Sequence, residues 1–276
     1  MSGTLYLVPT PIGNLGDISA RCRKTLEQAD FIAAEDTRVT LKLLNHLEIK
    51  KPLISYYEHN KLESGPHIVE RLLGGESCAL VTDAGSPAIS DPGEDLVALC
   101  ARAGICVSAI PGPCAVITAL SISGLPTGRF CFEGFLSTNK KSRREHLDGL
   151  RGETRTMIFY EAPHKLQNTL KDLAAAFGAE RRISLCRELT KLHEQVLRMT
   201  LGEAVAYYTE NDPRGEYVLV LEGAQAPVEQ SLTLEDAVAL ARGRIEAGAS
   251  KKDAVREISR ETGFPKNALY EAVLRI

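Results

Sequence analysis

Apolar and polar positions alternate in blocks along the first half of the chain. Short apolar runs rich in Val, Ile, Leu and Ala predict strands at 4–10, 31–36, 52–57, 78–83 and 105–110. The segments between them carry apolar residues at helical spacing and predict helices at 18–29, around 41–47, at 66–74, at 92–103 and at 113–123. Nearly continuous apolar strands that alternate with helices are typical of a parallel sheet covered on both faces. We therefore expect residues 1–124 to form an N-terminal α/β domain, closed by the helix at 113–123.

The alternation continues in the second half with one difference. It predicts strands at 129–135, 155–162, 181–189, 195–200 and 216–223, and helices at 141–150, 164–177 and 202–210. The two strands near 185–200 are joined by a short connection, which favours antiparallel pairing. We therefore expect residues 125–224 to form a second α/β domain with a mixed sheet. The Gly and Pro residues of 123–129 are typical of a linker between the two domains.

The last part of the chain, residues 225–276, predicts a linker and a small helical segment. Leu234, Val238, Ala241 and Ile245 fall on one helix face. A second helix is expected to start after Ser250, and a third with Pro265 at its first position, loosely like a helix-turn-helix. Residues 242–276 hold eight Lys/Arg against five Asp/Glu. Both a solvated helical cap and a contact with nucleic acid remain open.

Composition narrows the class of protein only a little. With 44% hydrophobic and 25% charged residues the chain is typical of a globular protein, and its net charge of -3 restricts nucleic-acid binding to local patches. The seven cysteines form no Cys-x-x-Cys pair, which indicates a reducing compartment. The start has no basic region before its apolar run, and no segment approaches the roughly 18 apolar residues of a membrane span. We expect a cytosolic protein.

The chemistry points to a small-molecule site without a metal. The chain has no Gly-x-Gly-x-x-Gly motif, no phosphate-binding P-loop, no His-Glu-x-x-His motif and no Cys/His cluster. Instead, Gly/Pro-rich loops at 9–14, 83–93 and 111–115 follow predicted strands, at the edge of a parallel sheet where ligands bind. Loops without bulky side chains let the backbone approach a ligand closely. Three ordinary tight turns would also need Gly and Pro, but three converging loops favour a ligand.

Polar side chains also gather at predicted strand ends. Glu35, Asp36 and Arg38 follow the second strand, although Asp36 or Thr37 could simply cap the next helix. In the second half, strand ends carry the polar residues Glu161, His164, Glu188 and Lys191. Several such groups facing one cleft from both domains favour a functional site.

Within the loop at 83–93, the phrases "TDAG" and "SDPG" look like copies but predict different roles. Asp91 is expected to be the N-cap of the following helix, with Pro92 at the first position and Glu94 at the third, which is a structural role. Residues 83–87 have no helix to start and are expected to form the binding loop, with Ile89 as an apolar contact.

A set of ordered motifs carries a resemblance to a known family. These motifs are "PTPIGNLGDIS", "AAEDTR", "TDAGSPAISDPG", "PGPCAVITALSISGLP", "GFL", "FYEAPHK", "RELTKLHE" and "RGEYVLVLEG", which together cover nearly all of residues 4–223. The chain resembles the ribosomal RNA small subunit methyltransferase I family, the 16S rRNA cytidine 2′-O-methyltransferases of the tetrapyrrole-methylase (class III) superfamily. The resemblance implies cytidine-1402 as the target.

The resemblance implies two α/β domains with S-adenosylmethionine in the cleft between them, and a homodimer that acts on the 16S rRNA of the small ribosomal subunit. It implies cofactor contacts from residues of both domains: Pro11, Asp83, Gly85, Ser86, Pro87, Ile89, Cys114, Ala115 and Tyr160. Gly215 and Glu216 match a further recurring motif.

The chain departs from the related patterns at three positions. Tetrapyrrole enzymes carry Gly-Asp-Pro where this chain has Gly85-Ser86-Pro87, so an acidic ligand contact is absent. The rRNA family usually has Ser at the position of Cys114, and a thiol is the weaker hydrogen-bonding group. It usually has Arg at the position of Lys165, so any phosphate contact there is with a point charge.

Methyl transfer to a ribose 2′-hydroxyl benefits from a general base, because the hydroxyl is a poor nucleophile near neutral pH. The sequence leaves four candidates open: Glu35, Asp36, Glu161 and Glu188. RNA contact is expected from Arg38, Lys165 and the basic group Lys140, Lys141, Arg143 and Arg144, with Arg151 and Arg155 nearby. Two alternatives stay open. One is a class III methyltransferase for a tetrapyrrole or another small molecule, and the other is a non-catalytic RNA-binding protein.

Overall fold

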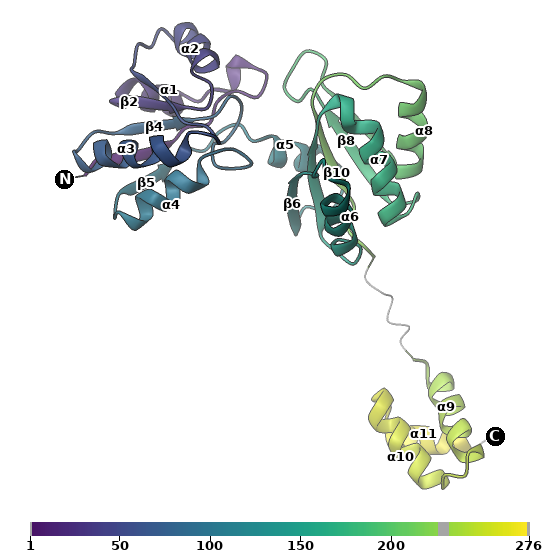
Figure 1. The fold of residues 1–276 in the computed structure, drawn as a ribbon. Helices are drawn as coiled ribbons and strands as arrows, with labels where there is room; N and C mark the ends of the chain where they lie inside the picture. Colours follow the sequence, from purple (N-terminus) through teal and green to yellow (C-terminus); the bar gives the residue numbers. More distant parts are fainter. Residues whose placement is uncertain (1, 226–231, 275–276) are drawn as a thin grey trace. The chain divides into compact units, whose positions relative to one another are not determined.

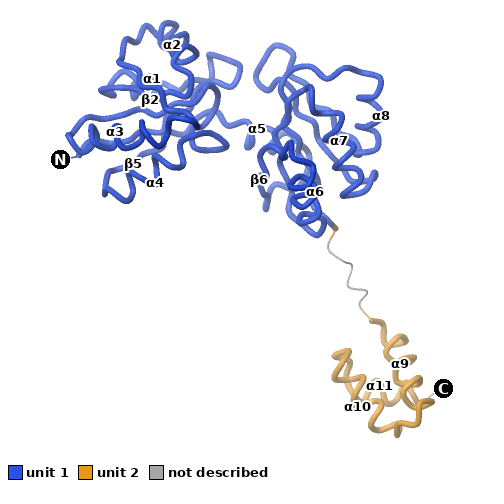
Figure 2. Tube along the Cα trace, in the orientation of Figure 1, with its two compact units in different colours: residues 1–224 blue, residues 225–276 orange. Residues whose placement is uncertain are grey.

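The computed structural model describes residues 2–225 and 232–274. The chain forms two compact units, residues 1–224 and residues 225–276 (Figure 1, Figure 2). The first unit contains two five-stranded sheets, and the described part of the second contains three helices. Among the described helices, none has both the length and the apolarity needed to cross a membrane.

The first sheet is entirely parallel, as the sequence predicts, with the strand order β3-β2-β4-β1-β5. Its strands are β1 (Thr4–Leu7), β2 (Phe31–Ala34), β3 (Leu53–Ser55), β4 (Cys78–Val81) and β5 (Cys106–Ala109). Every residue of β2 and β4 is buried, which explains why these strands are continuously apolar rather than alternating. Because all five strands run the same way, the loops after them meet at one edge.

Helices cover both faces of this sheet (Figure 1). They are α1 (Ala20–Gln28), α2 (Thr37–His46), α3 (Lys61–Leu73) and α4 (Glu94–Arg102), with a short 3-10 helix η1 (Leu15–Asp17) before α1. One face buries Leu26 of α1 and Leu44 of α2, and the other buries Ile68 of α3 and Leu96 of α4. Helix α3 begins five residues before the predicted start, with Pro66 inside it. The Asn60 side chain binds the backbone of Ser55 and Tyr57, and this turn lets the helix begin before the proline.

The second sheet is mixed, which confirms the prediction. It consists of β6 (Phe130–Phe135), β7 (Thr156–Glu161), β8 (Arg182–Arg187), β9 (Gln195–Thr200) and β10 (Tyr217–Leu221) in the order β6-β7-β10-β8-β9. Only the β6–β7 pair is parallel, and the short β8–β9 connection gives the expected antiparallel pair. One face is covered by α6 (Lys140–Gly149), α7 (Pro163–Phe177) and α8 (Leu201–Glu210).

The other face of the second sheet is covered by α5 (Ala115–Ile122). Val116, Ala119 and Leu120 pack with Ile158 of β7 and Val220 of β10. The expectation that this helix closes the first half is wrong. Its apolar residues occupy several sides of the helix, so periodicity alone could not tell which sheet it would cover. The expected boundary between residues 124 and 125 therefore separates α5 from the sheet that it covers, and the boundaries 1–124, 125–224 and 225–276 are kept only as a proposed division of the sequence.

The second unit has a small core of its own. Helices α9 (Leu234–Glu246), α10 (Lys251–Thr262) and α11 (Lys266–Leu274) bury Ala237, Val238, Ala241, Val255, Ile258, Leu269 and Val273. Ser250 caps α10 as predicted, and Gly263 ends it in the left-handed conformation. Leu234 is exposed rather than buried, and α11 begins just after Pro265 instead of including it. The predicted linker at 224–231 lies largely outside the described residues.

Candidate functional site

The three Gly/Pro-rich loops converge, as the sequence predicts. Thr10 and Gly85 form an isolated bridge with two backbone hydrogen bonds, of 2.9 and 3.0 Å. The Ser86 hydroxyl donates to the carbonyl oxygen of Pro113 over 3.0 Å. A Cβ atom on Gly112 would lie only 2.8 Å from Pro9, so this glycine permits close packing of the first and third loops. The loops after β1, β4 and β5 thus form one connected wall.

This wall borders a cavity of about 580 Å³, a size typical of small-molecule sites. The first sheet and its loops contribute Ile12, Glu35, Thr82, Asp83, Ala84, Gly85, Ser86, Ile89, Ser90 and Asp91. The start of α5 contributes Cys114 and Ala115. The second sheet and its loops contribute Phe135, Tyr160, Glu161, Ala162, Pro163, His164, Cys186, Leu189, Glu216, Tyr217 and Val218. The cavity therefore draws on both sheets of the first unit.

Most of the residues that the resemblance assigned to the cofactor line this cavity. They are Asp83, Gly85, Ser86, Ile89, Cys114, Ala115 and Tyr160. Pro11 and Pro87 are not among the lining residues; Pro87 is buried, and Ile12 lines the cavity in place of its neighbour. Cys114 is the N-cap of α5 but makes no side-chain cap bond, in keeping with the weak hydrogen bonding of a thiol.

Asp91 does not have the predicted structural role. Helix α4 begins at Glu94, with Gly93 at the N-cap position and no side-chain cap bond. Ala88 and Ser90 both have positive φ, and a Cβ on Gly93 would lie 2.9 Å from that of Ala88, so the loop folds tightly on itself before the helix. Asp91 lines the cavity instead. Both halves of the double phrase therefore belong to the site.

Three carboxyl groups meet where β2 and β4 end. Glu35 Oε2 accepts hydrogen bonds from the Thr82 hydroxyl at 2.6 Å and from the backbone N–H of Asp83 at 3.4 Å. Burial and the charge of Glu35 raise the pKa of Asp83. Burial, followed by the charges of Glu35 and Asp83, raises the pKa of Asp91 to about 6. The cavity thus concentrates negative charge on one side.

Glu161 lines the cavity but is 4% exposed and firmly held. It accepts hydrogen bonds from its neighbour Ala162 and from the Thr169 hydroxyl. Thr169 in turn accepts from Arg143, which also forms an ion pair of 2.6 Å with Asp172. Arg143 points inward and joins α6 to α7, so it does not belong to the exposed basic group that the sequence predicts.

The other two candidate bases lie outside the cavity lining. Asp36 caps α2 and binds the Arg38 guanidinium through both oxygens, which lowers the pKa of Asp36 to about 2. Glu188 accepts from Lys191 at 2.9 Å and from the Glu216 N–H at 3.0 Å, and these bonds lower its pKa as well. Lys191 also reaches Glu216, so the side chains on the β8–β9 and β10 loops hold each other in place. Both acids are poor bases near neutral pH.

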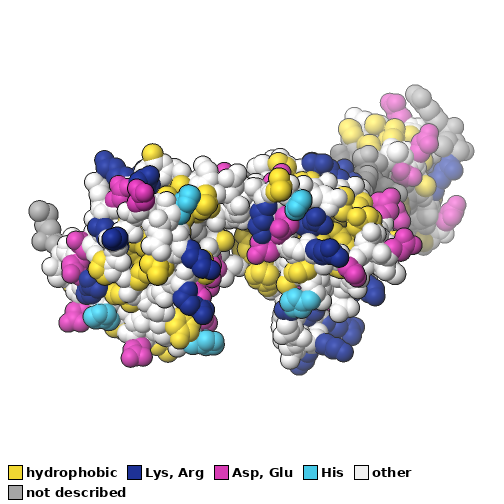
Figure 3. All heavy atoms as spheres, turned by 90° about the horizontal axis from the view of Figure 1, so that it is seen from above, with side chains coloured by type: hydrophobic (Ala, Val, Ile, Leu, Met, Phe, Trp, Pro, Cys, Tyr) yellow, Lys and Arg dark blue, Asp and Glu magenta, His cyan; other side chains and the backbone are white. Residues whose placement is uncertain are grey.

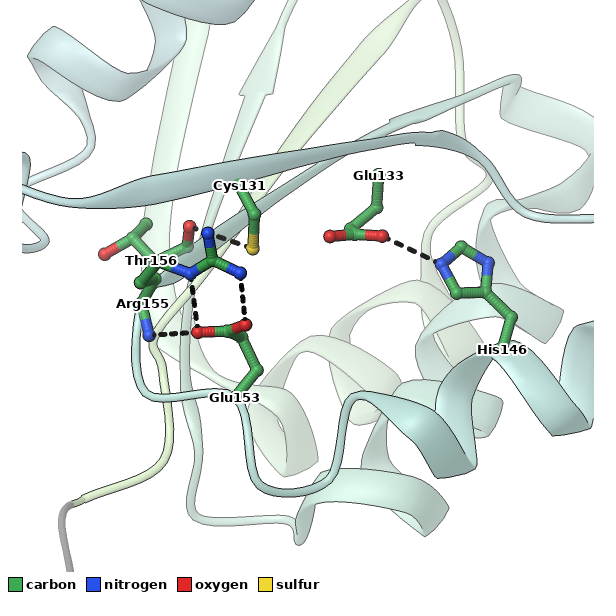
Figure 4. Close-up of polar contacts among 6 residues, drawn as sticks. All are labelled: Cys131, Glu133, His146, Glu153, Arg155 and Thr156. Atoms are coloured by element: carbon green, nitrogen blue, oxygen red, sulfur yellow. Dashed lines mark hydrogen bonds and ion pairs between the residues drawn. The ribbon is translucent and has the colours of Figure 1, made fainter.

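Arg151 and Arg155, the two arginines expected near the basic group, both form ion pairs within the chain. Arg155 forms a bidentate pair with Glu153, beside Cys131 and the Glu133–His146 contact (Figure 4). This pair lowers the pKa of Glu153 to about 2. Arg151 pairs with Asp148 at 2.9 Å. Figure 3 shows basic and acidic side chains next to each other at several places on one face of the first unit.

Three exposed cations of the predicted RNA-contacting group lie on α6. Lys140, Lys141 and Arg144 are exposed, and the ion pairs of Lys141 and Arg144 are long, at 3.9 and 3.7 Å. Lysines in the first turn lie at the positive end of the helix dipole, where they do not stabilise the helix. Lys165 lies in the first turn of α7, directly after the cavity residue His164.

Several lining residues were not predicted as part of the site. Phe135 packs at a tilt against Tyr160, with ring centroids 5.4 Å apart, and Tyr160 also meets Phe132 edge-on at 4.9 Å. Of these rings, Phe135 and Tyr160 line the cavity and give it an aromatic surface. Phe135 lies in the quoted motif "GFL", and Asp91 lies in "SDPG", so the motifs themselves were the available signal. Leu189 lies in the motif "RELTKLHE" and Val218 in "RGEYVLVLEG", where the charged residues alone suggest a functional role.

The fold and the cavity define a methyltransferase class. Residues 4–205 match the family model described as Tetrapyrrole (Corrin/Porphyrin) Methylases. Among solved structures, the methyltransferase CobJ aligns with a TM-score of 0.60 at 19% identity, covering 81% of this chain and 95% of that one. A uroporphyrin-III C-methyl transferase from Thermus thermophilus, complexed with S-adenyl homocysteine, aligns with a TM-score of 0.58 at 17% identity over 80% and 97%. The chain is a methyltransferase of the tetrapyrrole-methylase class.

Curated relatives place it more closely. Proteins named "Ribosomal RNA small subunit methyltransferase I" are 48% identical in Synechocystis sp., over 99% of this chain and 98% of the relative. They are 46% identical in Halalkalibacterium halodurans, over 97% and 93%, and 44% identical in Escherichia coli O157:H7, over 99% and 95%. The chain belongs to the ribosomal RNA small subunit methyltransferase I family.

Proposed function

We propose that this enzyme transfers the methyl group of S-adenosylmethionine to the ribose 2′-hydroxyl of a cytidine in 16S rRNA, with cytidine-1402 as the target. The observation that carries the proposal is the cavity at the convergence of the three loops, in a chain of this family. The enzyme is proposed to act in the cytoplasm as a homodimer. Support for the location comes from seven cysteines that are all free, and support for the dimer comes from the family resemblance.

The residues of the cavity suit S-adenosylmethionine. The lining includes the carboxyl groups of Glu35, Asp83, Asp91, Glu161 and Glu216, and no Lys or Arg side chain among the described residues. Such a lining favours a ligand with cationic groups, and the bound cofactor supplies a methyl group on a positively charged sulfur. The aromatic rings of Tyr160 and Phe135 and the side chain of Ile89 offer an apolar surface for the remainder.

Among the four candidate bases, the geometry favours Glu35. It lines the cavity, and both of its hydrogen bonds are made by Oε2, which leaves Oε1 for a substrate hydroxyl. Glu161 has a donor on each oxygen, while Asp36 and Glu188 are held by cations outside the lining. We infer that Glu35 accepts the proton of the 2′-hydroxyl, while the loops hold the reacting groups in line.

The decisive experiment is methylation by the purified enzyme with isotopically labelled S-adenosylmethionine. Small ribosomal subunits, free 16S rRNA and a tetrapyrrole such as uroporphyrinogen III serve as separate acceptors. We expect label in subunits or rRNA, recovered as 2′-O-methylcytidine after digestion to nucleosides. Label in the tetrapyrrole alone would contradict the proposal and favour the small-molecule alternative. Cofactor binding without transfer to any of the three would also count against it.

The exposed cations on α6 are proposed to contact phosphate groups. Replacing Lys140, Lys141 and Arg144 together by Ala is expected to weaken RNA binding and to reduce the slope of log affinity against log salt by about 2, as for three lost contacts to single-stranded RNA. Filter binding between 50 and 200 mM salt would measure this. A triple variant of Lys24, Lys50 and Arg102, exposed cations of the first-sheet half, removes the same charge. Equal slopes in the two triple variants would contradict the assignment.

A further inference from the structure

Asp91 occupies an unusual position for an acidic side chain. It lies in the loop between β4 and α4, beside two residues with positive φ, Ala88 and Ser90. Non-glycine residues in this conformation cost about 1–3 kcal/mol each and persist where the surroundings hold them, often at functional sites. The loop also lies near the second sheet, because a Cβ placed on Gly134 of β6 would lie 3.4 Å from the Ser90 hydroxyl oxygen. The fold therefore fixes Asp91 at the cavity rather than at the helix end.

A single hydroxyl group joins Asp91 to Glu35. Thr82 is buried, and its hydroxyl donates to Glu35 at 2.6 Å while lying within hydrogen-bonding reach of Asp91. A threonine has one hydroxyl hydrogen, so it can donate to only one carboxylate at a time. When Thr82 donates to Glu35, Asp91 is left without this donor. One neutral hydroxyl therefore serves two carboxyl groups whose negative charges oppose each other.

The acidic side chains around Asp91 also raise its pKa. Glu35 faces it from the end of β2, Asp83 from the end of β4, and the phenol of Tyr160 from β7. The remaining titratable groups of the lining are Cys114, Glu161, His164, Cys186, Glu216 and Tyr217. Arg38 is the cation that acts on this corner, and it is already bonded to Asp36. Without a cationic ligand, partial burial and then the charges of Glu35 and Asp83 raise the pKa of Asp91, so a fraction of this group is protonated near pH 6.

We propose that Asp91, with Thr82 and Glu35, makes the cavity sensitive to the charge of its ligand, so that it binds the cationic methyl donor in preference to the uncharged-sulfur product. The inference rests on the proposed function, since it takes S-adenosylmethionine as the ligand of this cavity. Binding of the sulfonium favours the ionised form of Asp91, so the fraction of Asp91 that is protonated in the free enzyme releases its proton to solvent. After transfer, S-adenosylhomocysteine has no positive sulfur, the carboxylate loses this partner, and the product is held less tightly.

The sign of the pH dependence follows from linkage. A cation lowers the pKa of a neighbouring carboxyl group, so the complex with S-adenosylmethionine binds fewer protons than the free enzyme. Affinity for S-adenosylmethionine should therefore rise as the pH increases through about 6, where free Asp91 titrates, and level off above it. Affinity for S-adenosylhomocysteine should change little over the same range.

Calorimetric titration of the full chain tests the inference directly. Each ligand is titrated at pH 6 in two buffers with different ionisation enthalpies, which gives the number of protons released. We expect S-adenosylmethionine to release about half a proton and S-adenosylhomocysteine nearly none. Asp91→Asn should abolish the difference, and Glu35→Gln should reduce the release by lowering the pKa of Asp91. Asp212→Asn, at an exposed position, is the control and should behave like the unmodified enzyme.

The outcomes separate the two proposals. Equal proton release with both ligands, or a difference that survives in Asp91→Asn, would overturn the charge-sensing role while leaving the methyltransferase proposal intact. Failure of the unmodified enzyme to bind either ligand would overturn both. Thermal unfolding of each variant shows whether it is folded, and the result with the unmodified enzyme does not depend on any variant.

Discussion

Replacing Gly85 by valine is expected to lower the affinity for S-adenosylmethionine more than tenfold, a loss of about 1.4 kcal/mol or more. Gly85 has a φ of +90°, and its Cβ would lie 3.3 Å from Ile12 Cγ2 and 3.8 Å from the carbonyl oxygen of Pro113. The two further methyl groups of valine must enter the cavity or push these neighbours apart. Either displacement separates loops that the Thr10–Gly85 bridge holds together. Calorimetric titration measures the affinity.

The matched control is Gly104→Val. Gly104 also has a positive φ, of +69°, but no heavy atom lies within 4 Å of a Cβ placed there. Both variants therefore carry backbone strain of about 1–3 kcal/mol, and both should unfold at a somewhat lower temperature. Only Gly85→Val should lose the cofactor. If the two variants bind it equally well, the loop convergence is not what forms the site.

Arg143→Ala is expected to lower the free energy of unfolding by about 2–3 kcal/mol, below the range for a fully buried ion pair because Asp172 is half exposed. The substitution leaves Asp172 without its cation and removes a donor to Thr169, which supports the buried Glu161. For a chain of this size the midpoint of thermal unfolding should fall by roughly 5–10 °C. Scanning calorimetry and urea denaturation would measure both quantities.

Arg144→Ala provides the comparison from the next position on α6. Its side chain is 85% exposed, against 13% for Arg143, and its pair with Asp148 is a surface pair at 3.7 Å. Such pairs contribute at most about 1 kcal/mol, so stability should hardly change while RNA affinity falls. The opposite result, a stable Arg143→Ala variant with weakened RNA binding, would restore Arg143 to the RNA-contacting group.

The sequence predicts the elements well because apolar periodicity follows burial directly. Buried parallel strands such as β2 and β4 have no polar alternation, and the amphipathic helices α1 and α7 bury the face that their spacing indicates. The convergence of the three loops also follows from the pattern, since parallel strands bring their ends to one edge. Tertiary packing is less accessible: nothing local in the apolar helix α5 indicates that it covers the second sheet.

The site was predicted in its location but only partly in its roles. Residues quoted within motifs, such as Gly85 and Tyr160, do line the cavity. The predicted N-cap role of Asp91 is wrong, although Asp-Pro-Gly-Glu fits a capping pattern. The loop before the helix contains two residues with positive φ, Ala88 and Ser90, and neither residue type predicts that conformation from sequence. Arg143 and Arg144 are consecutive in the sequence, and only the rotation of about 100° per helical residue directs the first inward and the second outward.

Helix α5 also limits how the chain can be divided. It follows the last strand of the first sheet without belonging to that layer, and its residues complete the core of the second. A fragment ending at residue 124 would carry this helix with its apolar side uncovered, and the complementary fragment would present the bare faces of β7 and β10 to water. The helix that follows the first sheet thus belongs to the core of the second sheet. A circular permutation or a pair of complementing fragments should therefore divide the chain before Cys114 rather than at residues 123–129.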